Sequence, residues 1–175
     1  MSCCVKNKGA ETFAMLQFDR EQLLYDIKNY CYVEGHIMSE DTEVHVRHTV
    51  QDVGEEGNVD RVSRVINLAI ERCRELLYPY TKEEAYMTSL KDILRKPNSY
   101  WLVLSLPKGF SQTTLYLLEN LIHEYLVCLA VADWLSITNP EKAQIWETKA
   151  NDAINEAHSK LRNRTKPLRR KLHPF

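Results

Sequence analysis

Residues 115–135 read LYLLENLIHEYLVCLAVADWL, and this run sets the architecture of the whole chain. Apolar residues cover nearly every face of a helix built on it, and from Tyr125 to Ala132 the tyrosine hydroxyl is the only polar group. A helix that is apolar all round is one that other elements surround. Ser111 is placed to cap it, and a helix over 111–137 would be about 40 Å long. We therefore expect a long, buried central helix.

A second helix is predicted directly after the first. Asn139-Pro140 supplies a capping residue followed by proline at the first helical position. The apolar positions that follow keep a seven-residue rhythm and include four alanines: Ala143, Trp146, Ala150, Ala153, Ile154, Ala157 and Leu161. Small residues on such a stripe let two helix backbones approach closely. Helices over 111–137 and 140–163 should therefore form an antiparallel hairpin.

The rest of the chain shows weaker helix and strand signals. Leu23, Leu24 and Ile27 begin a helical period that follows Asp19 and should stop at Gly35. Val44, Val46 and Val50 alternate with polar residues, which is the period of a half-buried strand. The predicted elements are helices over 19–33, from Asn58 to before Pro79, and from Thr81 to about Arg95, with strands over 43–50 and 100–106 that should pair with each other.

These elements predict a mostly α fold. It is a helical bundle of about five helices, with a long central helical hairpin, a small two-stranded β element and a C-terminal arm. The expected organisation is an N-terminal leader over 1–18, a helical domain over 19–163 and a basic arm over 164–175.

Composition narrows the class of protein. The chain has 175 residues, of which 44% are hydrophobic and 27% are charged, near the averages of globular domains. With 5 glycines and 6 prolines, a turn-rich β-sandwich or a collagen-like chain is not expected. The 5 cysteines show no metal-ligand spacing, and the first residues lack the apolar core of a signal peptide. The most apolar stretch, 125–132, is too short to span a membrane. We expect a soluble intracellular protein with free thiols.

Charge is distributed unevenly along the chain. From Ser159 to Phe175 there are seven Lys or Arg residues and no acid, although the whole chain has a net charge of −1. Between Glu34 and Asp60 there are eight acids and one strong base, Arg47. An acidic middle and a basic end bear on the choice of partners more than on the fold.

Motifs that carry catalytic chemistry are missing from the sequence, so we expect no enzyme, no cofactor and no metal. The best metal candidate is Glu119 with His123 and the adjacent Glu124, but carboxylate-bridged bundle sites use Glu-x-x-His from more than one helix. Asp133 interrupts the apolar helix and could be a catalytic base, or it could be paired with an arginine or mark the one exposed stripe of the helix.

Aromatic and imidazole side chains offer two further candidates. The tryptophans could line a pocket, although core packing is the simpler reading for the two on helix stripes: Trp101, Trp134 and Trp146. His45 and His48, three apart on a predicted strand, should lie on opposite faces at the surface.

The C-terminal arm is the segment most informative about partners. It combines cations with apolar anchors that end in Pro-Phe, and its candidate partner-binding residues are Arg164, Lys166, Leu168, Arg169, Arg170, Lys171, Leu172, Pro174 and Phe175. It could be a solvated basic tail at a helix end, a phosphate-binding segment for nucleic acid, or a segment that docks on an acidic protein surface. The terminal phenylalanine favours a protein partner.

The order of features in the last 75 residues carries a resemblance. A strand and a Leu-Pro turn precede the long helix with Tyr125 and Trp134-Leu135; then come Thr138-Asn-Pro140, an Ala/Trp helix, and the closing Arg169-Arg-Lys-Leu-His-Pro-Phe175. This resembles small helical proteins encoded by phages and prophages of Bacteroides-type bacteria. The helix content and the helix from Asp60 to Leu77 are similar to the head–tail connector (adaptor) proteins of tailed phages.

The resemblance implies a structural virion protein of the phage neck. Adaptors of this kind are helical bundles that assemble as homo-oligomeric rings, usually dodecamers, and bind the portal through a C-terminal arm. It further implies contact with portal or tail proteins, non-specific contact with packaged DNA, no membrane, and residence in the virion after assembly in the host cytoplasm. A tail-completion or terminator role stays open, as does a nucleic-acid-binding regulatory module that uses the same arm.

Overall fold

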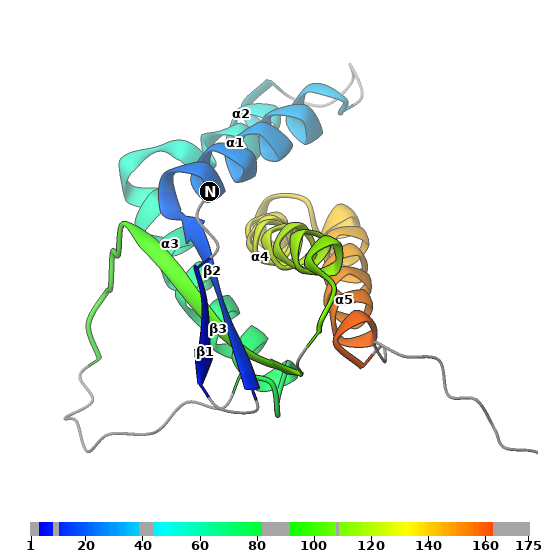
Figure 1. The fold of residues 1–175 in the computed structure, drawn as a ribbon. Coiled ribbons are helices and arrows are strands. Elements are labelled where there is room, and N and C mark those ends of the chain that lie inside the picture. Colours follow the sequence, from blue (N-terminus) through cyan, green and yellow to red (C-terminus); the bar gives the residue numbers. More distant parts are fainter. Residues whose placement is uncertain (1–3, 9–10, 39–43, 82–91, 108, 163–175) are drawn as a thin grey trace, which may run out of the picture.

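The computed structural model describes residues 4–8, 11–38, 44–81, 92–107 and 109–162 (Figure 1). These residues form five α-helices, one short 3-10 helix and one three-stranded sheet. In chain order the elements are β1 (Cys4–Lys8), β2 (Glu11–Asp19), α1 (Arg20–His36), α2 (Val44–Gln51), η1 (Asp52–Gly54), α3 (Glu56–Leu76), β3 (Ser99–Pro107), α4 (Gln112–Thr138) and α5 (Pro140–Arg162). The mostly helical class predicted from the sequence is confirmed.

The central hairpin is also confirmed. Ser111 caps α4, since its side chain accepts a hydrogen bond from the backbone N–H of Thr114 at 3.5 Å. Pro140 is the first residue of α5, which returns antiparallel along α4. The stripe that α5 buries is the predicted one from Trp146 onward: Trp146, Ala150, Ala153, Ile154, Ala157 and Leu161. Its alanines let the two helices pack closely.

Helix α4 lies at the centre of the fold. In Figure 1 it is seen nearly end-on, between the sheet on one side and α5 on the other, with α1 and α2 above it. By length and composition alone its 27 residues could cross a membrane, but 56% of its most apolar window is buried inside the fold. Its apolar surface is therefore covered by neighbouring elements on several sides, as expected for a helix that is apolar on most faces.

Helix α1 is longer than predicted because Gly35 does not end it. The helix continues to His36, and Gly35 is buried against α2. A Cβ at this position would lie 2.7 Å from Cγ of Gln51 and 3.1 Å from the carbonyl oxygen of Arg47. The glycine thus permits close approach of α2, and the role of helix terminator assigned to it was wrong.

The segment predicted as a strand over 43–50 is the helix α2. The Thr49 hydroxyl donates to the His45 carbonyl at 2.8 Å, one helical turn back, and Trp134 Nε1 donates to the Val50 carbonyl at 2.9 Å. His45 and His48 are exposed as expected, but they lie one helical turn apart and not on opposite faces of a strand. The predicted pairing of 43–50 with 100–106 was therefore wrong as well.

Helix α3 and the segment after it differ from the prediction at two places. The helix begins at Glu56, so Asn58 lies inside it rather than capping it, and donates to the Asp52 carbonyl at 2.8 Å. It ends at Leu76, before Pro79 as predicted. The buried Thr81 hydroxyl donates a hydrogen bond to the Arg74 carbonyl in the last turn of α3. Of the helix predicted over 81–95, residues 92–95 are not helical, and 82–91 lie outside the described residues.

The sheet has three strands in the order β1-β2-β3, one more than predicted. Strand β3 is the predicted 100–106 strand, but its partner is β2, antiparallel, with Ala14 opposite Leu104 and Phe18 opposite Tyr100. The segment 1–18 expected to be a leader therefore supplies two strands.

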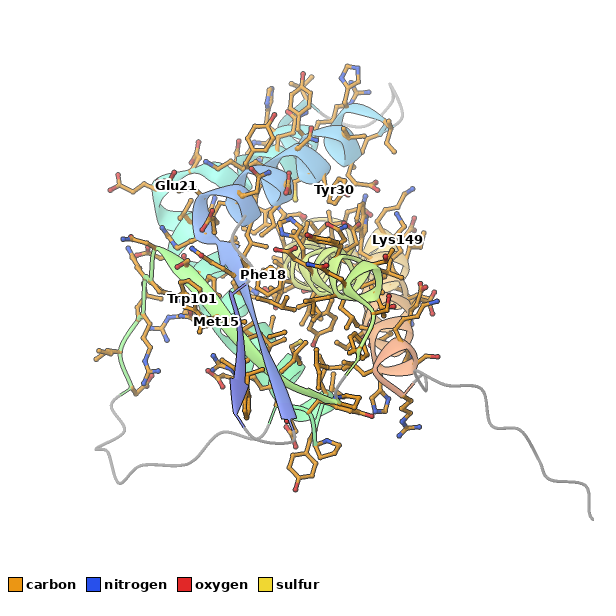
Figure 2. All side chains as sticks on the ribbon, in the orientation of Figure 1. Met15, Phe18, Glu21, Tyr30, Trp101 and Lys149 are labelled. Atoms are coloured by element: carbon orange, nitrogen blue, oxygen red, sulfur yellow. The ribbon has the colours of Figure 1, made fainter. Side chains whose placement is uncertain are left out.

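One face of the sheet is buried in the core. Ala14, Leu16 and Phe18 are buried on the α4 side, and in Figure 2 Phe18 lies on that side whereas Met15 and Trp101 lie on the other. The alternation of inward and outward side chains along β2 and β3 is that of a half-buried sheet.

Candidate functional site

The predicted partner-binding residues of the arm, within 164–175, lie outside the described residues. The structure does describe the helix that carries the arm. The last turn of α5 buries Leu161 against the core, and Lys160 Nζ lies 3.3 Å from Glu156 Oε1. The arm therefore begins at a helix end that is anchored in the hairpin, on the side of the molecule away from α1 and α2 (Figure 1).

The candidate metal ligands on α4 point to different partners. His123 Nε2 lies 2.8 Å from Asp26 Oδ2 of α1. Glu124 accepts hydrogen bonds from the Tyr30 hydroxyl at 3.2 Å and from the Cys128 thiol at 3.4 Å. Within the described part of the chain, no three His, Cys, Asp or Glu side chains come together in a way that could hold a metal ion.

A polar seam, defined here as Asp26, Tyr30 and Glu34, runs along the side of α1 that faces the hairpin. Its members are four residues apart, so they lie one above another on one face of the helix. Asp26 meets His123, Tyr30 meets Glu124, and Glu34 Oε1 accepts from Trp146 Nε1 at 3.0 Å. Figure 2 shows Tyr30 in this position between α1 and the hairpin.

The seam fixes α1 to both helices of the hairpin. The Tyr30 and Trp146 rings are 4.9 Å apart, and Lys149 Nζ lies 3.9 Å from the centre of the Trp146 ring. Burial, followed by the nearby Glu124 carboxylate, raises the pKa of Tyr30 to about 12, so the phenol stays protonated and donates its hydrogen bond. These groups are bonded to one another and none is presented as a free acid or base.

The seam is a feature that the sequence analysis missed. Its signal was the four-residue spacing of Asp26, Tyr30 and Glu34, which lies beside the apolar stripe Leu23, Ile27 and Cys31.

Three buried cysteines have thiols of low reactivity. Cys31, Cys73 and Cys128 are free and buried. Burial raises the pKa of each thiol to about 12, with Glu34 adding to the effect at Cys31 and Glu124 at Cys128. A thiol with so high a pKa carries almost no thiolate at neutral pH, and the thiolate is the nucleophile.

An open cleft of about 540 Å³ lies where β2, α1 and α4 meet. Its lining is partly polar, and three of its members carry carboxylates. The lining residues are Gln17, Phe18, Asp19, Gln22, Asp26, Glu119, Asn120 and His123. Two of the carboxylates already accept from neighbours, because Gln22 donates to Asp26 at 3.1 Å and Gln17 donates to Asp19 at 3.1 Å. Glu119 and His123 both line the cleft, and its described lining contains no Ser, Thr, Cys or Lys side chain that could act as a nucleophile.

The remaining sequence candidates have structural roles. Asp133 pairs with Arg61 at 3.0 Å, in agreement with the arginine-paired reading. Trp134 and Trp146 are buried in the core, as the packing reading predicted, and Trp101 is partly exposed on the outer face of the sheet.

Two exposed apolar surfaces stand out on the described residues. The first, named here the α1–α2 face, is the exposed part of α1 and α2, where Tyr25 and Tyr32 lie on one side of α1, Val33 and Ile37 lie nearer the side of the seam, and Val44 begins α2. The second is the α3–β3 groove, an open groove of about 870 Å³ whose apolar lining includes the exposed Leu68, Ile93 and Trp101. Exposed large apolar side chains that gather in this way mark surfaces for contact with other macromolecules.

Comparisons of the chain with known protein families, with curated proteins and with solved structures found no match.

Proposed function

We propose that the chain is a structural, non-enzymatic protein of a tailed-phage virion. It acts as a head–tail connector that forms a homo-oligomeric ring and uses its C-terminal arm, with Arg169, Arg170, Lys171, Leu172 and Phe175, to dock on the portal or on a neighbouring subunit. The cations of the arm and its apolar C-terminal residues would complement a protein surface that is acidic and partly apolar.

The observation that supports this proposal is the presence of two apolar surfaces on different elements of one small domain. A ring requires a heterologous contact, in which one patch of each subunit meets a different patch of the next. The α1–α2 face and the α3–β3 groove supply two such patches. A protein that bound only a small ligand would need neither.

The packing of the described domain fits an assembly role as well. The seam and the α4–α5 hairpin hold α1, α4 and α5 together through hydrogen bonds at 2.8–3.2 Å. A rigid domain loses little conformational entropy when it assembles, so more of the contact energy appears as affinity.

The test is the native mass of the full chain over a concentration series, beside a chain that ends at Asn163. A large closed oligomer, weakened by the truncation, is the expected result. A filter-binding assay then measures how much double-stranded DNA the same samples retain at several salt concentrations. Tight retention of DNA that falls steeply with salt would contradict the proposal and favour a nucleic-acid-binding module. Failure both to self-associate and to bind an assembled portal would also contradict it.

A further inference from the structure

We propose that the C-terminal arm rests on its own subunit, with Leu172 and Phe175 seated in a pocket between α3, α4 and α5. The inference deepens the proposed function by naming the site from which the arm must be released before it docks on another surface. It rests on that function only in taking the arm to be the docking segment.

The pocket has a volume of about 260 Å³ and combines apolar with polar lining. Its apolar members are Val65, Leu68, Leu129, Ala132 and Ala143, and its polar members are Arg72, Asp133, Ser136 and Glu147. A lining of this kind suits a segment that brings an apolar anchor together with charged neighbours.

The pocket lies over a gap in the cover of α4. From Tyr125 to Leu135 every apolar residue of that helix is buried except Leu129, which is partly exposed. Leu68, which lines the pocket from α3, is 51% exposed. A helix that is apolar on most faces needs other elements around it. An apolar side chain seated over Leu129 and Leu68 would complete that cover.

The arm supplies apolar side chains that gain from burial. Leu168, Leu172 and Phe175 are spaced by four and three residues, and cations stand between them. Removal of such side chains from water is favourable, but a segment of this length is too short to form a core of its own. The arm therefore needs a surface that it did not itself supply.

Chain length allows the end of the arm to return to the pocket. Glu147 lines the pocket from α5 and precedes Arg162 by fifteen residues, which is about 22 Å along the helix. Leu168 reaches at most about 22 Å from Arg162 and falls short once the width of the helix is added. Leu172 reaches at most about 36 Å and Phe175 at most about 47 Å, so both arrive without full extension of the chain.

Attachment to the same chain favours contact within one subunit over the same contact between two. A short flexible tether holds a segment near its site at an effective concentration of about 1 mM. A second copy offers its arm only at the concentration of the free protein. At micromolar protein the arm therefore occupies the pocket of its own subunit.

Charge at the pocket complements the arm on the α5 side. Glu147 is exposed and forms no ion pair with any residue that the structure describes. Lys171 directly precedes Leu172, so a seated leucine brings an ammonium group close to that carboxylate. Arg72 lines the α3 side and repels the cations of the arm from there. Complementary charge thus orients the arm along α5.

The experiment uses five full-length chains with labelled leucine methyl groups. The arm variant carries Leu172→Ser and Phe175→Ser, and its control carries Leu168→Ser, at a position that does not reach the pocket. The rim variant carries Glu147→Lys. Its control carries Asp152→Lys, which makes the same change of charge at an exposed position on a different side of α5. The fifth chain is the wild type, and circular dichroism establishes that each is folded.

Two NMR readouts report on the pocket. Nuclear Overhauser effects between the methyl groups of Leu172 and Leu129 report contact, and a mixture of differently labelled chains shows whether that contact lies within one chain. Relaxation of the Leu129 methyl groups by a soluble gadolinium chelate reports their exposure to solvent. The methyl groups of Leu117, which is 39% exposed on the same helix, serve as the reference.

We expect the wild type and both controls to keep Leu129 covered, with its relaxation well below that of Leu117. In the wild type the contact with Leu172 should lie within one chain. The arm variant should lose the contact and bring the relaxation of Leu129 up toward that of Leu117. The rim variant should do the same in part, because a lysine at position 147 repels Lys171. If the arm variant does not fold, the rim variant and its control decide.

Several results would overturn the inference. They are a wild type without the contact, a contact seen only between differently labelled chains, and a rim variant that keeps Leu129 fully covered. A Leu168→Ser chain that exposes Leu129 as much as the arm variant does would overturn it as well. None of these results changes the native mass of the assembled chain, so the proposed function stands or fails on its own test.

Discussion

The hydrogen bond between Trp146 and Glu34 should make an energetic contribution that a double-mutant cycle can isolate. Trp146 is 5% exposed, and the Glu34 side chain that accepts its N–H at 3.0 Å is 12% exposed. Glu34 Oε2 has no hydrogen-bond partner among the described residues, and its nearest cation, Lys142 Nζ, is 3.9 Å away. The carboxylate therefore depends heavily on the indole.

The perturbation is Trp146→Phe, alone and combined with Glu34→Met. Loss of a hydrogen bond to a charged group costs about 1.5–3 kcal/mol, and the smaller ring leaves a gap beside Tyr30 that costs about 1 kcal/mol more. The expected total is about 2.5–4 kcal/mol, which lowers the melting temperature by roughly 5–16 °C for a chain of this size. Glu34→Met alone should cost less, because it removes the buried charge together with its desolvation penalty.

The assay is urea unfolding followed by far-ultraviolet circular dichroism on the wild type, both single variants and the double variant. In the Glu34→Met background, Trp146→Phe should lose only its packing part, about 1 kcal/mol, which gives a coupling of about 2 kcal/mol. Effects that add to within about 0.3 kcal/mol would refute the reasoning. So would a Glu34→Met chain as unstable as the Trp146→Phe chain.

Three further outcomes follow from the described residues. Ser111→Ala should lower the free energy of unfolding by about 0.5–1 kcal/mol through loss of the α4 cap, measured by urea titration; no change would mean that the cap is not formed. Asp133→Asn should cost under about 1 kcal/mol, because the pair with Arg61 is exposed, and a larger cost would contradict that reading. Cys31, Cys73 and Cys128 should react with a thiol reagent at pH 8 only after unfolding, which peptide mapping can check site by site. Their folded pKa values of about 12 lie above the ordinary value of 9.0, so stability should be intact below pH 9 and fall as the pH rises through 12; urea midpoints that stay constant up to pH 11 would exclude this linkage.

The helical hairpin could be predicted from sequence because its signals are long and agree with one another. The apolar run of α4, the cap at Ser111, the Asn139-Pro140 start and the alanine stripe of α5 each predict the same arrangement. In α4 and α5 the local helix preference and the tertiary packing favour the same structure.

The N-terminal half was harder to predict because its elements are short or apolar on both faces. In α2, Val46 and Val50 are four apart, a spacing that fits both a strand and a helix over eight residues. In β2, the outward-facing Phe13 and Met15 are apolar, as are the buried Ala14 and Leu16 between them, so no alternation of polar and apolar residues was visible. Tertiary contacts, such as that of Trp134 with Val50, resolve what the local pattern left open.

The site could be anticipated only in part. The sequence pointed to the arm by composition, and to Asp133 and the tryptophans as structural groups. It did not point to the polar seam, since Tyr30 and Glu124 are far apart in the chain and meet only in the fold. It also did not point to the α1–α2 face, because a lone exposed Tyr32 is indistinguishable in sequence from a core aromatic residue.

The order of the strands sets a delay between the synthesis of β2 and its pairing with β3. Asp19 at the end of β2 pairs with Ser99 at the start of β3, and the 79 residues between them must be made first. At about 5–20 residues per second the ribosome needs roughly 4–16 s for that interval. During those seconds Leu16 and Phe18 have neither β3 beside them nor α4 above them. A substitution that makes β2 more hydrophobic should therefore reduce the yield of folded protein in cells more than it reduces the stability of the folded protein.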